Sequence, residues 1–298
     1  MQGGVRMKKL IDVSSYNGTV NWEKAKAYGC QGAILKIIRK DLARDKQFNA
    51  NYEACNENEV DWGVYNYSYA TTAKKAKSDM EIVCDILDKI DKEYFTYGVW
   101  FDLEDKAQAS LSKTKIAEII NAAQQVVEER GYLFGVYTGM SYYNEHIDRK
   151  LVKCNNWWIA RYYRGDARMQ IATNPDQEKK PAAANIAWQY TSKGRFPKII
   201  SSGNSGNFDL NVLYKEPVAK KVEENIKKPI KKKITYYPRY KGKSSSIVDA
   251  LKLLSINPSK SNRKRIATLN GIKNYTGTAT QNTKLLNLLK RGKLIKSK

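Results

Sequence analysis

Hydrophobic and polar positions recur with two different periods along the first 214 residues. Eight short apolar runs, rich in Val, Ile, Tyr, Trp and Phe, are bounded by Gly, Asn, Asp or Ser, which is typical of strands. Between several of these runs, apolar positions recur with helical spacing. The predicted strands are Lys9–Ser14, Gly32–Ile38, Trp62–Ser68, Gly98–Glu104, Phe134–Thr138, Trp157–Tyr162, Ile186–Thr191 and Asn207–Leu213. The predicted helices are Trp22–Tyr28, Phe48–Asn58, Ala73–Ile90 and Lys115–Arg130.

This alternation of strand and helix indicates an α/β fold, and eight strands favour a TIM-like (β/α) barrel. A doubly wound open sheet is the competing architecture. It is disfavoured because no Gly-x-Gly-x-x-Gly motif follows the first predicted strand. A chain of 298 residues can bury a barrel core and still have residues left for a second module.

Two carboxylates lie two residues apart at the end of the fourth predicted strand. Because side chains alternate along a strand, Asp102 and Glu104 are expected on the same face. Like charges at close range raise proton affinity, so one of the pair is expected to hold a proton near neutral pH. A protonated acid beside an ionised one is what the cleavage of a glycosidic bond requires. For an isolated Asp-x-Glu pair, an acidic turn at a strand end is the simpler interpretation.

Two further carboxylates are candidates for the same site. Barrel active sites lie at the carboxyl ends of the strands, and Asp12 is near the end of the first predicted strand. Asp209 comes early in the last predicted strand, so a parallel strand would place it at the opposite end of the barrel. An antiparallel strand or an entry loop would bring it to the same mouth. Periodicity alone leaves these alternatives open.

Several motifs occur in a fixed order over about residues 7–214: Asp12–Gly18 with Val20–Trp22, then Phe101–Glu104, Gly135–Thr138, Trp158–Tyr162, and Trp188–Gly194 with Asp209–Val212. Together they resemble glycoside hydrolase family 25, the lysozymes that cut peptidoglycan between N-acetylmuramic acid and N-acetylglucosamine. The loop after the second strand departs from the family pattern. Arg39 and Lys40 stand where family members often carry an acidic residue.

The resemblance implies a barrel of eight strands with fewer than eight helices, in which the last strand runs against its neighbours. It implies Glu104 as the general acid and Asp102 as the group that tunes it and supports positive charge on the sugar. Asp12 and Asp209 would complete an acidic floor. Sugar faces pack on aromatic rings, although each ring could equally belong to the barrel core. The expected groove-lining residues are Tyr65, Tyr67, Tyr137, Trp158 and Trp188.

No cofactor or metal is expected from the sequence. The four cysteines form no Cys-x-x-Cys pair, and His146 is the single histidine, so no metal-ligand cluster can be recognised. A Gly-x-x-x-x-Gly-Lys-Ser/Thr motif is also missing. Irregularly spaced cysteines in a chain of this length are expected to be reduced, buried thiols of a protein folded in the cytoplasm.

Positive charge is concentrated in the last third of the chain. Residues 215–298 contain 23 Lys and Arg against four acids, a net charge of +19, which leaves about +4 for the first 214 residues. Residues 215–235 have the Lys- and Pro-rich composition of a linker. Residues 236–298 contain apolar segments with helical spacing at 247–254, 265–271 and 285–289, which predict a small, mainly helical module.

This basic module is expected to bind the cell wall. The segments 266–272 and 292–296 partly resemble LysM repeats, which bind wall glycans. Anionic wall polymers are expected partners, because a strong positive charge attracts polyanions over long range. Nucleic acid would be attracted equally, but a recognition helix and an aromatic stacking platform are missing. A basic solvated tail is a further alternative, disfavoured by the apolar periodicity.

The function predicted from the sequence is therefore a muramidase that acts on bacterial peptidoglycan. An N-acetylglucosaminidase acting on the same polymer and a non-catalytic glycan-binding barrel are the alternatives. Residues 1–6 are interpreted as an extension before a natural start at Met7. With no apolar run long enough for a signal peptide or a membrane span, we expect an endolysin-like protein made in the bacterial cytoplasm that acts at the wall after release.

Overall fold

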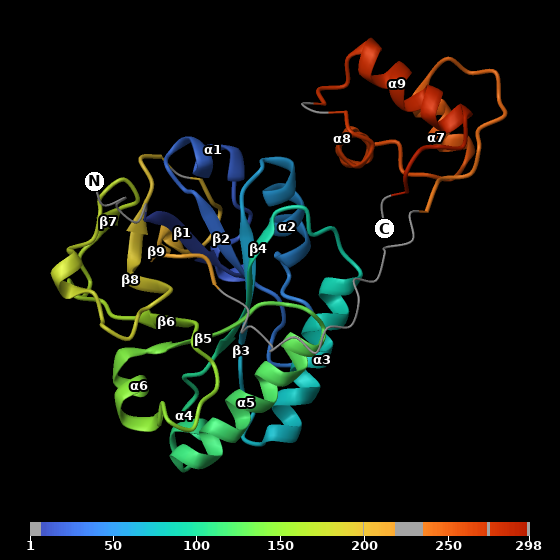
Figure 1. The fold of residues 1–298 in the computed structure, drawn as a ribbon. Helices are drawn as coiled ribbons and strands as arrows, with labels where there is room; N and C mark the ends of the chain where they lie inside the picture. The colour runs from blue at the N-terminus through green and yellow to red at the C-terminus, as the bar shows by residue number, and fades with distance from the viewer. Residues whose placement is uncertain (1–6, 199, 218–234, 273–274, 297–298) are drawn as a thin grey trace, which may run out of the picture. The chain divides into compact units, whose positions relative to one another are not determined.

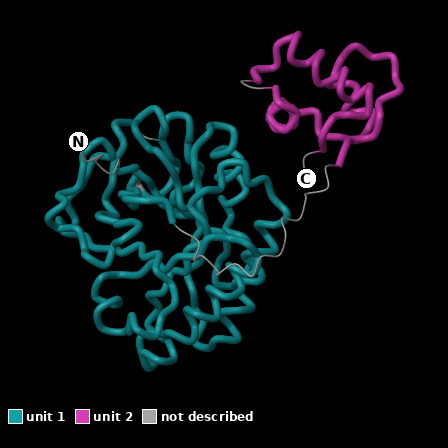
Figure 2. The backbone as a smooth tube through the Cα atoms, in the orientation of Figure 1, with its two compact units in different colours: residues 1–221 teal, residues 222–298 magenta. Residues whose placement is uncertain are grey.

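The computed structural model describes residues 7–198, 200–217, 235–272 and 275–296. The chain divides into two compact units, residues 1–221 and residues 222–298 (Figure 2). The predicted extension at residues 1–6 and most of the predicted linker lie outside the described residues. The predicted division at residues 215–235 therefore stays a prediction.

The first unit is built around a closed barrel (Figure 1). Eight strands are hydrogen-bonded in the order β1–β2–β3–β4–β5–β6–β8–β9, and β9 also pairs with β1. The predicted barrel is thus confirmed, and the open sheet is wrong. A two-residue strand, β7 (Met169–Gln170), pairs with the last residues of β8. The barrel strands are β1 Lys8–Val13, β2 Gly32–Lys36, β3 Trp62–Tyr67, β4 Phe95–Asp102, β5 Phe134–Gly139, β6 Trp157–Ala160, β8 Ala187–Arg195 and β9 Phe208–Leu213.

Strand β9 runs antiparallel to both of its neighbours, whereas the other adjacent barrel strands are parallel. This confirms the direction implied by the family resemblance. Because β9 starts at the mouth of the barrel, its second residue lies beside the carboxyl end of β1. Asp209 is accordingly the backbone partner of Asp12.

Between residues 7 and 217, the described part of the first unit contains six α-helices, fewer than the strands, as expected. The two long helices, α3 and α5, pack against each other outside the barrel (Figure 1). Each starts at a hydroxyl cap: Thr72 accepts a hydrogen bond from the amide of Lys75, and Ser112 from that of Lys115. The helices are α1 Trp22–Ala27, α2 Phe48–Glu57, α3 Ala73–Asp88, α4 Lys106–Ala109, α5 Lys113–Glu129 and α6 Met140–His146.

Two apolar layers hold this unit together. The larger layer joins the outer face of the barrel to the helices. The smaller one fills the barrel and includes Leu10, Trp100, Tyr137 and Trp158. A Cβ atom on Gly135 would lie 2.4 Å from the ring of Trp100, so this glycine makes room for the indole. The carboxyl ends of the strands therefore stand above a packed aromatic floor.

The second unit contains the three helices α7 (Ile247–Leu253), α8 (Lys260–Leu269) and α9 (Ala279–Lys290), which share one apolar cluster. This agrees with the predicted small helical module. The two LysM-like segments lie partly in α8 and around an isolated bridge between Tyr236 and Ile295. Their resemblance to LysM stays a prediction. Across the described residues of both units, each helix is too short or too polar to cross a membrane.

Candidate active site

The four predicted carboxylates gather at the mouth of the barrel. Asp12 is the penultimate residue of β1, Asp102 is the last residue of β4, and Asp209 enters from β9. Glu104 lies two residues beyond β4 rather than within it. The charge of Asp12 acts on both Asp102 and Glu104, and that of Glu104 acts on Asp209. The carboxylates thus form one electrostatic group.

Asp12 and Asp209 share a hydrogen bond across the β1–β9 pair. A hydrogen bond between two carboxyl groups requires a proton on one of them. Burial and the charge of Asp209 raise the pKa of Asp12 well above its ordinary value of 3.8. Burial also raises the pKa of Asp209, to about 6. Asp12 is therefore the member that holds the proton.

Two side-chain amides donate hydrogen bonds to the same carboxyl oxygen of Asp12. The Nε2 atom of Gln189 donates to Asp12 Oδ2 at 2.9 Å, and the Nδ2 atom of Asn211 donates to the same oxygen at 2.8 Å. Both amide side chains are almost completely buried. They hold the carboxyl group of Asp12 in place beside Asp209.

Asp102 is the most deeply placed acid of the group. Its side chain is buried, and within the described residues its Oδ1 atom has no hydrogen-bond partner. Burial, followed by the charge of Glu104, raises the pKa of Asp102 well above 3.8. An acid in this position resists ionisation until a positive charge develops nearby.

Glu104 reaches solvent but stands in a concave part of the surface. Surrounding protein atoms displace part of its hydration, and this effect together with the charge of Asp12 raises the pKa of Glu104 above 4.5. An accessible carboxyl group with raised proton affinity can deliver a proton to a bound substrate. The geometry is therefore that of a general acid beside a buried partner.

The mouth also contains a cation that the sequence analysis missed. Lys36 ends β2, and its charge lowers the pKa of both Asp102 and Glu104. Its Nζ atom lies 5.9 Å from the ring centroid of Tyr65 and 5.8 Å from that of Tyr67. A lone lysine inside the apolar run Gly32–Ile38 was the available signal. The buried amides of Gln189 and Asn211 were also missed. Each is a polar residue inside a predicted strand, which was the available signal.

Below the carboxylates, two of the predicted aromatic residues link the floor to the site. The rings of Tyr137 and Trp158 lie 4.4 Å apart. Tyr137 donates its hydroxyl hydrogen to Gln189 at 2.8 Å, and the indole of Trp158 donates to Asn211 at 2.8 Å. Both aromatic side chains are more than 90% buried, so they support the site from below.

Tyr65 and Tyr67 are half-buried at the mouth, where burial, and after it the charges of neighbouring acids, raise their pKa values. Tyr162, which was not predicted, is 41% exposed and donates a hydrogen bond to Gln189 at 2.6 Å. It brings an accessible ring to the side of the groove where Glu104 lies. Its place at the end of the family-like motif Trp158–Tyr162 was the available sequence signal.

The structure does not bring Trp188 to this group. Trp188 is fully buried in the outer layer, where it packs against Tyr163 and Tyr190. Its indole donates a hydrogen bond to the carbonyl oxygen of Arg161 at 3.0 Å. Because side chains alternate along β8, Gln189 faces the barrel interior while Trp188 faces outward.

Two hollows at the mouth are lined by three of its four acids, Glu104, Asp12 and Asp209. One, of about 600 Å³, is lined by Glu104, Tyr137 and Tyr162 together with the start of α6. The other, of about 240 Å³, is lined by Asp12, Asp209, Lys36 and Tyr65. Residues of two short 3-10 helices, η1 (Ser15–Asn17) and η3 (Asn204–Gly206), also line it. A polymer lying along the mouth would therefore meet acids and aromatic rings in both hollows.

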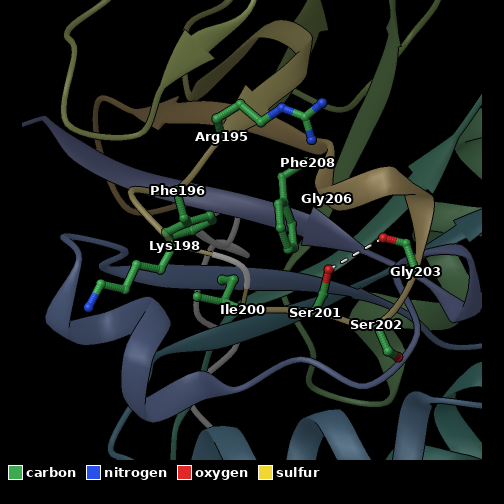
Figure 3. A pocket seen from close by; sticks show the side chains of 9 residues that line it. All are labelled: Arg195, Phe196, Lys198, Ile200, Ser201, Ser202, Gly203, Gly206 and Phe208. Carbon is green, nitrogen blue, oxygen red and sulfur yellow. Dashed lines mark hydrogen bonds between the residues drawn. The ribbon is translucent and has the colours of Figure 1, made fainter.

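A third hollow, of about 460 Å³, lies beside the β8–β9 connection (Figure 3). Arg195, Phe196 and Phe208 are among its lining residues, and Ser201 donates a hydrogen bond to the carbonyl oxygen of Gly203. Phe208 belongs to the outer layer, whereas the next residue, Asp209, faces the mouth. No carboxylate lines this hollow, so we assign it no catalytic role.

Within the described residues, no group of three or more His, Cys, Asp or Glu side chains is arranged to hold a metal ion. The four cysteines are buried and unpaired. Burial raises the pKa of Cys30 to about 11, which disfavours the nucleophilic thiolate. The chemistry that the described site offers is acid–base chemistry by carboxyl groups.

Comparison with known families identifies the barrel. The family model "Glycosyl hydrolases family 25" matches residues 11–199, which is more than half of the chain. The chain belongs to glycosyl hydrolase family 25. It is therefore a glycoside hydrolase, and the four carboxylates at its mouth are the acids available to a family 25 site.

Solved structures show the same fold at low sequence identity. The catalytic domain of the endolysin ply40, from bacteriophage P40 of Listeria monocytogenes, is 20% identical with a TM-score of 0.55. That match covers 71% of this family 25 chain and 95% of the other. The modular autolysin LytC from Streptococcus pneumoniae, in complex with a synthetic peptidoglycan ligand, is 23% identical with a TM-score of 0.54. It is matched over 70% of this chain and 47% of its own.

A curated relative shares a much shorter segment. The L-alanyl-D-glutamate peptidase of Listeria phage A118 is 56% identical over 50 residues. These residues make up 17% of this chain and 18% of the relative, so the two proteins share less than a fifth of their lengths.

Proposed function

We propose that this family 25 glycosyl hydrolase is a muramidase that cleaves the β-1,4 bond between N-acetylmuramic acid and N-acetylglucosamine in peptidoglycan. The observation that carries the proposal is the pairing of an accessible acid, Glu104, with a buried acid, Asp102, at the mouth of a family 25 barrel. Family membership supplies the class of bond, and the carboxyl pair supplies the chemistry.

In the proposed reaction, Glu104 protonates the oxygen that leaves the sugar. Asp102 lies beside it and becomes easier to ionise as positive charge develops on the sugar ring, so its stabilising effect is greatest in the transition state. Asp12 and Asp209 share a proton and extend the acidic surface. Lys36 limits how far the proton affinities of Asp102 and Glu104 can rise.

The substrate is proposed from the shape and lining of the groove together with the relatives. Tyr65, Tyr67 and Tyr162 offer accessible ring surface, whereas Tyr137 and Trp158 support the floor. LytC, which has the same fold, was solved with a synthetic peptidoglycan ligand. A glycan polymer from the bacterial wall is the substrate class that fits both observations.

The test is digestion of purified Gram-positive peptidoglycan by the wild type and by Glu104→Gln, followed by reduction and identification of the new chain ends. Muramitol ends from the wild type, with a loss of about 10²- to 10⁴-fold in Glu104→Gln, are expected for a muramidase with this general acid. Glu57→Gln, which removes an exposed carboxylate from α2, serves as the matched control and should retain activity.

Other outcomes would change the proposal in specific ways. Glucosaminitol ends would keep the barrel chemistry and assign the enzyme to the other bond of the polymer. Sedimentation with the wall but no new chain ends would identify a binding protein instead. Full activity in Glu104→Gln would remove this residue from the role of the acid.

We further propose that the second unit binds the wall, with anionic wall polymers as partners. Residues 215–298 have a net charge of +19, and the described part of the second unit has its own apolar core. A glycosidase and a peptidase cut different bonds. The segment shared with the phage A118 peptidase is therefore proposed to lie in this unit and to serve the common target.

Sedimentation with purified walls tests this second proposal. A chain ending at residue 221 should lose wall binding while still cleaving soluble glycan fragments. Binding of the full chain should weaken with rising salt if polyanions contribute. Unchanged sedimentation of the shortened chain would contradict the proposal, as would tighter binding of the second unit to nucleic acid than to walls.

A further inference from the structure

Two lysines and two tyrosines form a continuous ladder at one side of the mouth. Lys36 Nζ lies 5.8 Å from the ring centroid of Tyr67, whose ring is 4.8 Å from that of Tyr69. Lys40 Nζ lies 4.7 Å from the centroid of Tyr69. The ladder therefore leads in three short steps from the carboxylates to a second cation.

Arg39 and Lys40, two neighbouring cations of the β2–α2 loop, are in different electrostatic states. Arg39 makes a two-pronged ion pair with Asp41, with contacts of 2.6 and 3.1 Å, so its charge is already compensated. Lys40 is exposed and, within the described residues, has no carboxylate partner. A cation held over an aromatic ring is restricted in position without being neutralised. The ring of Tyr69 thus holds Lys40 in position beside the mouth of the barrel, where its positive charge is not compensated by a carboxylate within the described residues.

We propose that Lys40, positioned by Tyr69, binds a carboxylate of the peptide attached to the glycan and makes peptide-bearing strands the preferred substrate. This inference rests on the proposed function, because it assigns a substrate preference to the same groove. The peptides of peptidoglycan are linked to the muramic acid residues next to the bonds that a muramidase cuts. A recognition group close to the catalytic acids can therefore reach a peptide carboxylate while the glycan occupies the mouth.

The local charge pattern favours a carboxylate over a phosphate polymer. A polymer with repeated phosphate charges is best matched by several uncompensated cations in a row. Here the neighbouring Arg39 is already paired and Lys36 faces the catalytic acids, so Lys40 is the uncompensated cation of the ladder. Arg44 and Lys46 follow in the same loop but do not belong to the ladder. A single uncompensated ammonium group in the ladder suits one carboxylate.

The experiment compares kcat/KM on two polymers: peptidoglycan strands that carry their peptides, and the same strands stripped of peptide by an amidase. Both are prepared from walls freed of teichoic acid. In Lys40→Gln, the ratio of kcat/KM on peptide-bearing strands to that on stripped strands should fall about two- to fivefold, the range expected for one exposed ion pair. Lys40→Arg keeps the charge and should largely preserve the ratio.

A matched control removes the same charge from the same loop. Lys46 is exposed and has no aromatic ring partner within the described residues, so Lys46→Gln should leave the ratio unchanged. Replacing the ring tests the positioning role: Tyr69→Leu should lower the ratio, whereas Tyr69→Phe retains the ring and should not. Melting temperatures of all variants identify any change that comes from folding.

The outcomes separate this inference from the proposed function. If the wild type cleaves neither polymer, both the proposed function and this inference fail. If it cleaves both and Lys40→Gln leaves the ratio unchanged, only the inference fails. A Lys40 effect that appears only when teichoic acid is left on the wall would overturn the peptide assignment and point to phosphate.

Discussion

Asp12 and Asp209 face each other across the antiparallel β1–β9 pair and share a hydrogen bond at the mouth of the barrel. They come from the first and last strands of the unit, and two buried amides hold the Asp12 side of the pair in place. The pair therefore holds one shared proton, on Asp12, close to Asp102 and Glu104.

Replacing Asp209 should change how stability depends on pH. Its pKa is raised from 3.8 to about 6, so between these values the folded state binds more protons than the unfolded state. Stability from this group is thus fully present below pH 3.8 and is lost as pH rises towards 6, by up to about 3 kcal/mol. Urea unfolding of Asp209→Asn from pH 4 to 8 should show a shallower decline than the wild type.

A surface aspartate provides the comparison for that measurement. The Asp166 side chain is 98% exposed, so Asp166→Asn should follow the wild-type curve. An identical pH dependence in wild type and Asp209→Asn would mean that the pKa of Asp209 is not raised in the folded protein.

Removing the charge of Lys36 should extend activity to higher pH. This cation lowers the pKa of both Asp102 and Glu104. In Lys36→Met their pKa values should rise, and the general acid should stay protonated at higher pH. The alkaline limb of the kcat/KM profile is expected to move upward, with Lys46→Met as a control that leaves it in place. A downward move would contradict the assigned sign.

Asn211 should be important for stability as well as for the site. Its side chain accepts the indole hydrogen of Trp158 and donates to Asp12. Asn211→Ala leaves the buried indole of Trp158 without a partner and removes one of the two amides that bind Asp12, which should lower the free energy of unfolding by about 1–3 kcal/mol. Asn49→Ala, at an exposed position of α2, should cost less than about 0.5 kcal/mol in the same denaturation experiment. Equal losses would show that Asn211 is not a structural link.

Two glycines of β5 test the packing under the site. In Gly135→Ala the new methyl group would meet the ring of Trp100 at 2.4 Å, which should cost about 1–3 kcal/mol of stability. At Gly139 a Cβ atom meets nothing within 4 Å, so Gly139→Ala should be tolerated in thermal unfolding. If the two melting temperatures fall equally, the loss comes from strand flexibility and not from the contact with Trp100.

Much of the barrel could be predicted because its strands are apolar runs with clear boundaries. The positions of Asp12 and Asp102 at the strand ends followed from those runs. The direction of the last strand did not, because an antiparallel β9 has the same alternation as a parallel one. The family resemblance resolved this point for Asp209. The short helices α4 and α6 were missed because they offer too few turns for a helical period.

The choice of Trp188 instead of Gln189 is an error of one position along strand β8. Trp188 and Gln189 are neighbours on β8, and a change of one position moves a side chain from the barrel interior to the outer layer. Aromatic residues attract attention as sugar platforms, so Trp188 was chosen and Gln189 was overlooked. Lys36 was missed for a different reason: a lone lysine within a predicted strand can also face solvent, and only the packed structure shows which charges it faces.

The antiparallel strand β9 both closes the barrel and supplies one of the four acids of the site. Strand β9 supplies Asp209, pairs with β1 through Lys8 and Leu213, and seals the gap between β1 and β8. A nascent chain that has not yet added these residues has three of the four acids and a sheet with two open edges, and its Asp12 lacks both Asp209 and Asn211. We predict that such a chain is inactive. Activity is therefore expected only after β9, the last strand of the barrel to be synthesised, has paired with β1 and β8.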